Sequence, residues 1–104
     1  MDSANQHPAV KLAESRLKAH AHQILPNSQV WLFGSRATKK ALRHSDFDLA
    51  VQLDEKTPES ALFDFEETVK ADPEIIYAVD IVNLNSAPVA VRQEIHRNGI
   101  LWTN

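Results

Sequence analysis

Apolar residues near the start of the chain recur every three or four positions, which is the spacing of one face of an α-helix. This spacing predicts a helix from about Pro8 to Gln23. The apolar positions of this helix are Val10, Ala13, Leu17, Ala21 and Ile24. The segment from Leu25 to Ser28 is then expected to turn, because its proline stops the helix and the following asparagine and serine favour local side-chain to backbone hydrogen bonds.

Short apolar stretches further along the chain predict strands. The first, Gln29 to Phe33, is rich in β-branched and aromatic residues and ends at a glycine. The second spans Asp46 to Leu53. Its alternating pattern directs Phe47, Leu49 and Val51 toward the core.

Two further apolar stretches complete the predicted strands. Residues 75–84 form a long apolar run whose one interior charge is Asp80, which shares a strand face with Val82. The last predicted strand is short and covers residues 100–102.

Capping residues and prolines mark a helix between the second and third strands. Thr57 is predicted to cap this helix, with Pro58 at its first position. The helix should end before Asp72, because Pro73 disfavours helix in the residue that precedes it. Its inner face is expected to carry Leu62, Phe65 and Val69.

Two other helices are predicted. A short one should cover Ser35 to Lys40, and Ser86 is expected to cap a last helix that closes with Gly99 as a left-handed C-terminal cap. The resulting alternation of helices and strands predicts an α/β (α+β) fold, with helices packed on a mixed sheet.

Composition restricts the class of protein further. At 104 residues the chain has room for one domain, residues 1–104, and 43% hydrophobic with 24% charged residues is an ordinary globular composition. No apolar run approaches the roughly 20 residues that cross a bilayer, and the first residues lack signal-peptide features. We therefore expect a cytoplasmic protein without membrane contact. Because the chain has no cysteine, disulfides and thiolate metal sites are excluded.

Positive charge is concentrated in one segment. The net charge is −3, yet Arg36, Lys39, Lys40 and Arg43 carry +4, so the remaining residues carry −7. A surface that is negative overall disfavours stable nucleic-acid binding. The basic segment is therefore interpreted as local: it reaches a triphosphate, docks an acidic partner, or is a solvated loop.

Gly34 and Ser35 directly follow the first predicted strand and form a strand-to-loop turn. A glycine lets the backbone approach a ligand closely, and a helix that starts at Ser35 would direct unpaired N–H groups at an anion. Phosphate is the expected guest, bound by the hydroxyl and the backbone N–H of Ser35. The alternative is an ordinary turn.

Asp46 and Asp48 point to the same side of the second predicted strand, with Cα atoms roughly 6.6 Å apart. Two carboxylates on one face can share a divalent cation, and hard oxygen ligands suit Mg²⁺ held together with substrate phosphates. Asp80 lies inside an apolar strand, which is costly unless the carboxylate is paired, coordinated or at a wet end of the sheet. The alternatives are acidic residues kept for solubility and, for Asp80, a solvated edge position.

Two of these features form one motif: Gly34-Ser35 is followed, after a gap of nine residues, by Ser45-Asp46-Phe47-Asp48-Leu49-Ala50-Val51. This motif resembles the signature of the nucleotidyltransferases related to DNA polymerase β. The short chain is similar to their minimal form, the minimal nucleotidyltransferases (MNT), which often serve as the antitoxin beside a HEPN-domain ribonuclease toxin. The resemblance extends from Val30 to Trp102 and implies a polymerase β-like core with a mixed four-stranded sheet. The chain departs from the family where Thr38-Lys39 replaces a common Arg-Gly pair.

The resemblance also implies roles for individual residues. Metal binding and catalysis fall to Asp46, Asp48 and Asp80, and nucleotide binding falls to Gly34, Ser35, Arg36 and Ser45. Two Mg²⁺ ions would be held by the three carboxylates, and Asp80 would also draw the proton from an attacking hydroxyl.

As the resemblance implies, the chain transfers AMP from ATP to a tyrosine hydroxyl of a HEPN toxin and thereby silences the toxin. No residues remain for a domain that selects the acceptor, so we expect a partner to supply it, in a homo- or hetero-oligomer. Two other functions stay open: a non-catalytic antitoxin that masks the HEPN partner by contact, and a nucleotidyltransferase for small molecules such as aminoglycosides. Metal-dependent ATP turnover separates the enzyme from the contact antitoxin.

Overall fold

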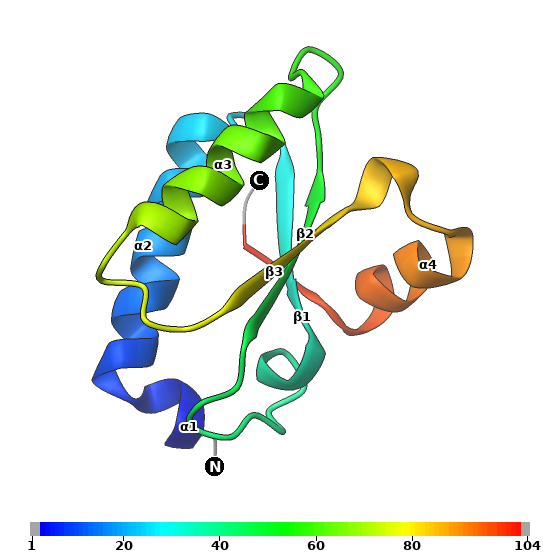
Figure 1. Cartoon of the computed structure of the whole chain (residues 1–104). Helices are drawn as coiled ribbons and strands as arrows, with labels where there is room; N and C mark the ends of the chain where they lie inside the picture. Colours follow the sequence, from blue (N-terminus) through cyan, green and yellow to red (C-terminus); the bar gives the residue numbers. More distant parts are fainter. Residues whose placement is uncertain (1–2, 103–104) are drawn as a thin grey trace.

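Residues 3–102, which the computed structural model describes, contain a mixed sheet of four strands (Figure 1). The strands are β1 (Gln29–Phe33), β2 (Phe47–Gln52), β3 (Val79–Asn83) and β4 (Ile100–Leu101). They are arranged in the order β3-β2-β1-β4; β1 runs antiparallel to β2 and β4, whereas β2 and β3 are parallel. The mixed α/β fold predicted from the sequence is confirmed.

Helices cover both faces of the sheet. They are α1 (Ser3–Gln6), α2 (Pro8–Ile24), α3 (Glu59–Ala71) and α4 (Val89–Asn98), with two short 3₁₀ helices, η1 (Gly34–Arg36) and η2 (Leu84–Ser86). In Figure 1, α2 and α3 lie side by side on one face of the sheet and α4 lies on the other. Within residues 3–102, no helix is both long and apolar enough to cross a membrane.

The main hydrophobic core lies between the sheet and the helices α2 and α3. Alternation along β2 turns Phe47, Leu49 and Val51 toward these helices, and each of the three is at most 1% exposed. The inner helix faces expected from the sequence are confirmed by burial: Val10, Ala13, Leu17 and Ala21 on α2, and Leu62, Phe65 and Val69 on α3. The apolar pattern therefore predicted the main core correctly.

A smaller apolar cluster lies on the opposite face of the sheet, under α4. Its buried members are Ala50, Leu84 and Ile95, with partly buried aromatic residues of β1 around them. Asp48 precedes Ala50 by two residues and so shares this face. This face of the sheet is thus apolar where α4 covers it and carries the carboxylate of Asp48 near the start of β2.

β1 has the predicted bounds, whereas β2, β3 and β4 are shorter than predicted. β3 comprises Val79–Asn83 rather than residues 75–84. Phe47 at the start of β2 pairs with Val79, so residues before Val79 have no neighbouring strand segment on β2. The apolar side chains of these residues led to the prediction of a longer strand, but Ile76 is 69% exposed. Likewise β2 starts at Phe47, and Asp46 lies just before it.

The two predicted side-chain caps are wrong. Pro58 is the N-cap of α3 and offers no side-chain hydrogen bond, so Thr57 does not cap this helix. Ser86 belongs to η2, and Pro88 is the N-cap of α4. In both cases the chain is extended at the proline, and the helix begins one residue after it.

Gly99 and the short helix also differ from prediction. Gly99 is extended, with φ −80°, and is not a left-handed cap. A side chain is nevertheless excluded, because a Cβ atom there would lie 2.5 Å from the Ile95 carbonyl oxygen and 3.2 Å from the Leu32 carbonyl oxygen. Glycine thus lets the end of α4 lie against β1. The helix expected from Ser35 to Lys40 is reduced to η1.

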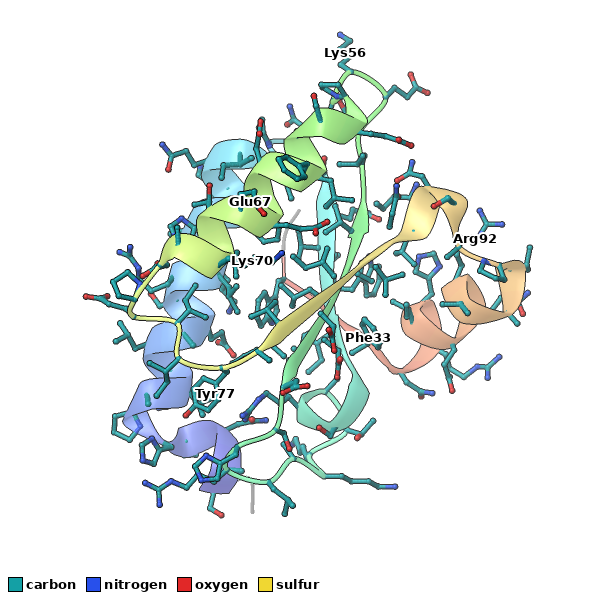
Figure 2. All side chains as sticks on the ribbon, viewed as in Figure 1. Phe33, Lys56, Glu67, Lys70, Tyr77 and Arg92 are labelled. Carbon is teal, nitrogen blue, oxygen red and sulfur yellow. The ribbon has the colours of Figure 1, made fainter. Side chains whose placement is uncertain are left out.

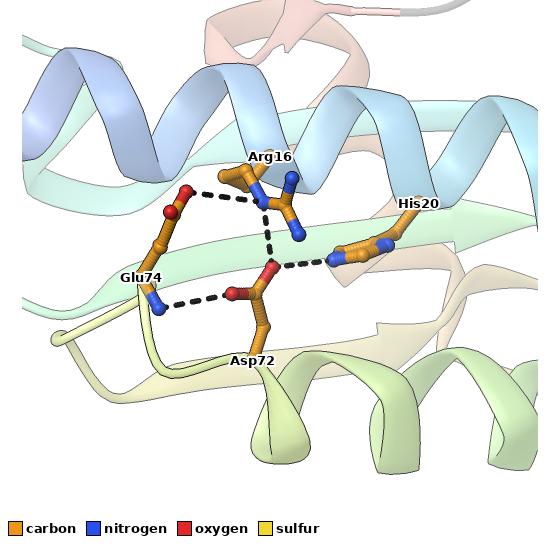
Figure 3. Close-up of polar contacts among 4 residues, drawn as sticks. All are labelled: Arg16, His20, Asp72 and Glu74. Atoms are coloured by element: carbon orange, nitrogen blue, oxygen red, sulfur yellow. Dashed lines mark hydrogen bonds and ion pairs between the residues drawn. The ribbon is translucent and has the colours of Figure 1, made fainter.

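A polar cluster around Asp72 ties α2 to the segment after α3 (Figure 3). The Asp72 side chain is 3% exposed, and its Oδ2 accepts hydrogen bonds from Arg16 Nε at 2.8 Å and His20 Nε2 at 2.7 Å. Its Oδ1 accepts from the Glu74 backbone N–H at 2.9 Å. The His20 hydrogen bond, followed by the one from Glu74, lowers the pKa of Asp72 to about 2. The cluster therefore stabilises the ionised carboxylate.

The core assignment predicts opposite outcomes for two phenylalanines of α3. Phe65 is fully buried and Phe63 is 61% exposed. We expect Phe65→Ala to lower the free energy of unfolding by about 3–5 kcal/mol through lost burial and a cavity, and Phe63→Ala to change it by no more than about 0.5 kcal/mol. Urea titrations of both variants measure these values, and similar losses at the two positions would contradict the packing of α3.

The Asp72 cluster predicts a loss of stability in acid. Because the folded-state pKa of Asp72 lies below its ordinary value of 3.8, its contribution is complete above that value and is lost as the pH falls toward 2. Asp72→Asn should therefore lower the free energy of unfolding at pH 7, and the difference from wild type should shrink toward pH 2. Urea titrations across this range test it, with the exposed Asp64→Asn as control. A difference that does not change with pH would show that ionisation of Asp72 is irrelevant.

Candidate active site

Three carboxylates gather at one end of the sheet. β1 ends there, and β2 and β3 begin there. Asp48 on β2 lies opposite Phe33 of β1 on one side and opposite Asp80 of β3 on the other. Neighbouring strands are about 4.8 Å apart, so the register places Asp48 and Asp80 side by side on one face. Phe33, labelled in Figure 2, marks this end of β1, where the chain enters η1.

The negative charges of this cluster affect one another. The pKa of Asp48 is raised above its ordinary value, first because the carboxylate is partly buried and then because of the charges of Asp80 and Asp46. Asp46, just before β2, and Asp80 are both exposed. The three residues predicted from the sequence as metal ligands are therefore brought close enough for electrostatic coupling.

The three carboxylates are chemically suited to bind a divalent cation. Asp46, Asp48 and Asp80 offer hard oxygen ligands, and their mutual repulsion is what a bound cation would relieve. Within residues 3–102, no three His, Cys, Asp or Glu side chains are already arranged to enclose a metal ion. A cation bound at Asp48 would therefore need the exposed side chains of Asp46 and Asp80 to turn toward it.

Gly34 brings the backbone of the turn against Asp48. Its φ of +74° lies in the left-handed region, which favours glycine. A Cβ atom at this position would overlap Oδ2 of Asp48. Ser35 follows in η1, half-buried, so the Gly-Ser turn predicted to hold phosphate lies directly beside the carboxylates.

Arg36 and Ser45 contact each other in the loop between β1 and β2. The Arg36 side chain is 2% exposed and donates from Nη2 to the Ser45 carbonyl oxygen at 2.6 Å. The Ser45 hydroxyl accepts a hydrogen bond from the Leu42 backbone N–H at 2.9 Å. Of the four residues predicted to bind nucleotide, Gly34 thus lies against Asp48 and Ser35 follows it in the turn, whereas Arg36 and Ser45 hold the loop that leads to Asp46.

The rest of the basic segment is at the surface. Lys39 and Lys40 are exposed, and Arg43 Nη2 lies 3.1 Å from Nε2 of His7. With Arg36 in the interior, the exposed positive charge beside the turn is smaller than the sequence predicted. The basic cluster is therefore divided between a structural arginine and solvated side chains.

Sequence reasoning missed Asn5, which lies in α1. Its Oδ1 accepts a hydrogen bond from Arg36 Nη1 at 2.8 Å, and its Nδ2 donates to the Arg36 carbonyl oxygen at 2.9 Å. No periodicity or motif marks Asn5, because α1 has only four residues and none of them is buried. Only the folded chain brings Asn5 beside the Gly-Ser turn.

The carboxylates lie on an open surface. A cleft of about 310 Å³ lies between α3 and β3, and a cleft of about 540 Å³ lies between α2 and β4, but neither is lined by the three aspartates. Exposed Asp46 and Asp80 instead face solvent at the end of the sheet. The site is accessible to a large molecule as well as to a small one.

Comparison with known sequences and structures places this site in context. The family profile described as "Polymerase beta, Nucleotidyltransferase" matches residues 19–103. Comparison with proteins of curated function gives no match.

Three solved structures illustrate the likeness of the fold. A chain from a toxin–antitoxin complex with AMP-PNP has a TM-score of 0.69 and 24% identity, over 88% of this chain and 73% of that one. For a complex of tri-AMPylated Shewanella oneidensis HEPN toxin with MNT antitoxin, the TM-score is 0.65 and the identity 22%, over 90% and 72% of the two chains. For the toxin–antitoxin complex MntA-HepT, the values are 0.64 and 22%, over 90% and 73%. At these identities the likeness establishes the fold.

The contact between Gly34 and Asp48 predicts coupled effects of substitution. Gly34→Ala should lower the free energy of unfolding by about 1 kcal/mol or more, because alanine is strained at this φ and its methyl group meets the carboxylate. In an Asp48→Ala background the clash is absent, so the same substitution should cost less, with a coupling energy of about 0.5–3 kcal/mol. Urea titrations of the four proteins give this value. Equal costs in both backgrounds would place Asp48 away from the turn.

Proposed function

The chain belongs to the polymerase β nucleotidyltransferase family, and on that premise we propose that it transfers AMP from ATP to a hydroxyl group of a partner protein. The observation that carries this proposal is the register of β2 and β3, which aligns Asp48 with Asp80 beside the turn at Gly34. An acidic cluster next to a glycine turn is suited to a metal-bound triphosphate.

Mg²⁺ is the proposed cofactor, held by Asp46, Asp48 and Asp80. The pKa of Asp48 is raised first by burial and then by the charges of Asp80 and Asp46, and a bound cation would compensate those charges. When bound, two such ions would neutralise charge on the phosphates and favour ionisation of the acceptor hydroxyl.

The chain's own residues position the reactants. The absence of a side chain at Gly34 lets the turn lie against the Asp48 carboxylate, and we assign the hydroxyl and backbone N–H of Ser35 to donate hydrogen bonds to the phosphates. The acceptor oxygen forms a bond to the α-phosphorus while the bond to the β-phosphate oxygen breaks, and pyrophosphate leaves. Asp80 is exposed at the edge strand, so it can accept the proton of an approaching hydroxyl.

The proposed partner is a HEPN-domain toxin, with this chain as its antitoxin and a toxin tyrosine as the acceptor. Two of the structural neighbours support this choice, because one is a complex with a tri-AMPylated HEPN toxin and the other contains AMP-PNP. The open surface around Asp46 and Asp80 also suits a protein acceptor. The proposed assembly is therefore a hetero-oligomer in which the toxin completes the site.

Transfer of label provides the test. Purified protein is incubated with Mg²⁺, ATP labelled at the α-phosphate and a purified HEPN-domain toxin as the acceptor. Wild type should label the HEPN protein, and Asp46→Asn/Asp48→Asn should reduce the rate by more than about 100-fold, because charge stabilisation by the metal contributes several kcal/mol. Its fold should persist, with an unchanged or raised thermal midpoint, since repulsion at Asp48 is relieved.

Asp64→Asn on the outside of α3 is the matched control and should transfer at the wild-type rate. Tight binding of the HEPN protein without any label would contradict the enzymatic proposal and identify a contact antitoxin. Loss of folding in the double Asn variant would show that the two aspartates are structural.

A further inference from the structure

Arg36 contacts both chain neighbours of Asp46. Its Nε and Nη2 donate to the carbonyl oxygen of Ser45, at 3.2 and 2.6 Å. Its Cζ lies 4.7 Å from the centre of the Phe47 ring. Asp46 stands between these two residues in the chain, so one buried guanidinium holds the backbone before it and the side chain after it.

The same guanidinium reaches the segment that leads to Asp80. Its Cζ lies 5.1 Å from the centre of the Tyr77 ring, and Tyr77 precedes Asp80 by three residues. Phe47 and Tyr77 also contact each other edge to face, with ring centres 5.8 Å apart. The starts of β2 and β3 are thus packed around a single side chain.

Arg36 is fixed in turn by polar contacts on its other sides. Nη1 donates to Asn5 Oδ1 at 2.8 Å, and Nη2 also lies 3.3 Å from the Arg43 carbonyl oxygen. With 2% of its surface exposed, the side chain has little freedom to turn toward a phosphate. Only the planar fork of an arginine can serve these acceptors together, because lysine presents one compact ammonium group.

We propose that Arg36 is a positioning residue, which sets Asp46 relative to Asp48 and Asp80 and does not contact the nucleotide. The inference rests on the proposed function, since it concerns the same carboxylates. It reverses the role that the sequence motif implies for this arginine. Asp46 is exposed and precedes β2, so the contacts that Arg36 makes with Ser45 and Phe47 fix the backbone from which its carboxylate extends.

The test measures metal binding and kinetics separately. Arg36→Lys keeps the charge but loses the fork. We expect Mn²⁺ to bind this variant about 10–100-fold more weakly in the absence of nucleotide, as is typical when a group supporting a metal ligand is removed. The kcat of labelling should fall, while KM for ATP stays within about twofold of wild type. Lys40→Met, which removes an exposed charge from the same segment, should leave Mn²⁺ affinity unchanged.

Unchanged Mn²⁺ affinity would overturn the proposal, and a raised KM for ATP beside it would make Arg36 a phosphate ligand. If Arg36→Lys does not fold, Asn5→Ala serves as the test variant, because it removes one hydrogen-bond partner of the guanidinium. Asn5→Ala should also weaken Mn²⁺ binding, and an unchanged Mn²⁺ affinity would overturn the proposal. Wild type that binds Mn²⁺ but transfers no label would contradict the proposed function alone, and the Mn²⁺ affinities would still decide the role of Arg36.

Discussion

The register between β2 and β3 is the constraint on which the site depends. It places Asp48 opposite Asp80, two like charges that would separate if the strands were free to slide. The strands are held by the other face of the sheet, where Phe47, Leu49 and Val51 are buried against α2 and α3. A slip of one residue would bury Asp48 and expose these side chains, so the hydrophobic core fixes the carboxylates.

The face that carries the carboxylates is divided along the strands. The part of this face under α4 is apolar, because Ala50 and Ile95 are buried there. Two residues before Ala50, the same face carries Asp48, which lies against the turn at Gly34. The packed part supplies stability, and the charged part is left open to a ligand. Partial burial, and after it the charges of Asp80 and Asp46, raise the pKa of Asp48 in the folded chain.

Local pattern was sufficient to predict much of the fold and part of the site. Period-two alternation in β2 and the helical spacing in α2 identified the main core, because those signals depend on nearby residues. The pairing of Asp48 with Asp80 required the strand register, which no local pattern contains. Arg36 shows the same limit: its sequence neighbours mark a phosphate turn, whereas its burial depends on Asn5 and Tyr77, which are distant in the sequence. The length of β3 was overestimated because apolar side chains such as Ile76 can remain exposed when no strand is available for pairing.

A crystal structure of the chain with Mn²⁺ and a non-hydrolysable ATP analogue, recorded where manganese scatters anomalously, would test directly whether the three carboxylates bind metal. We expect manganese within coordination distance, about 2.1 Å, of carboxylate oxygens from Asp46, Asp48 and Asp80, with the triphosphate against Gly34 and Ser35. Nucleotide bound elsewhere, or manganese absent from these carboxylates while the nucleotide is bound, would contradict this expectation.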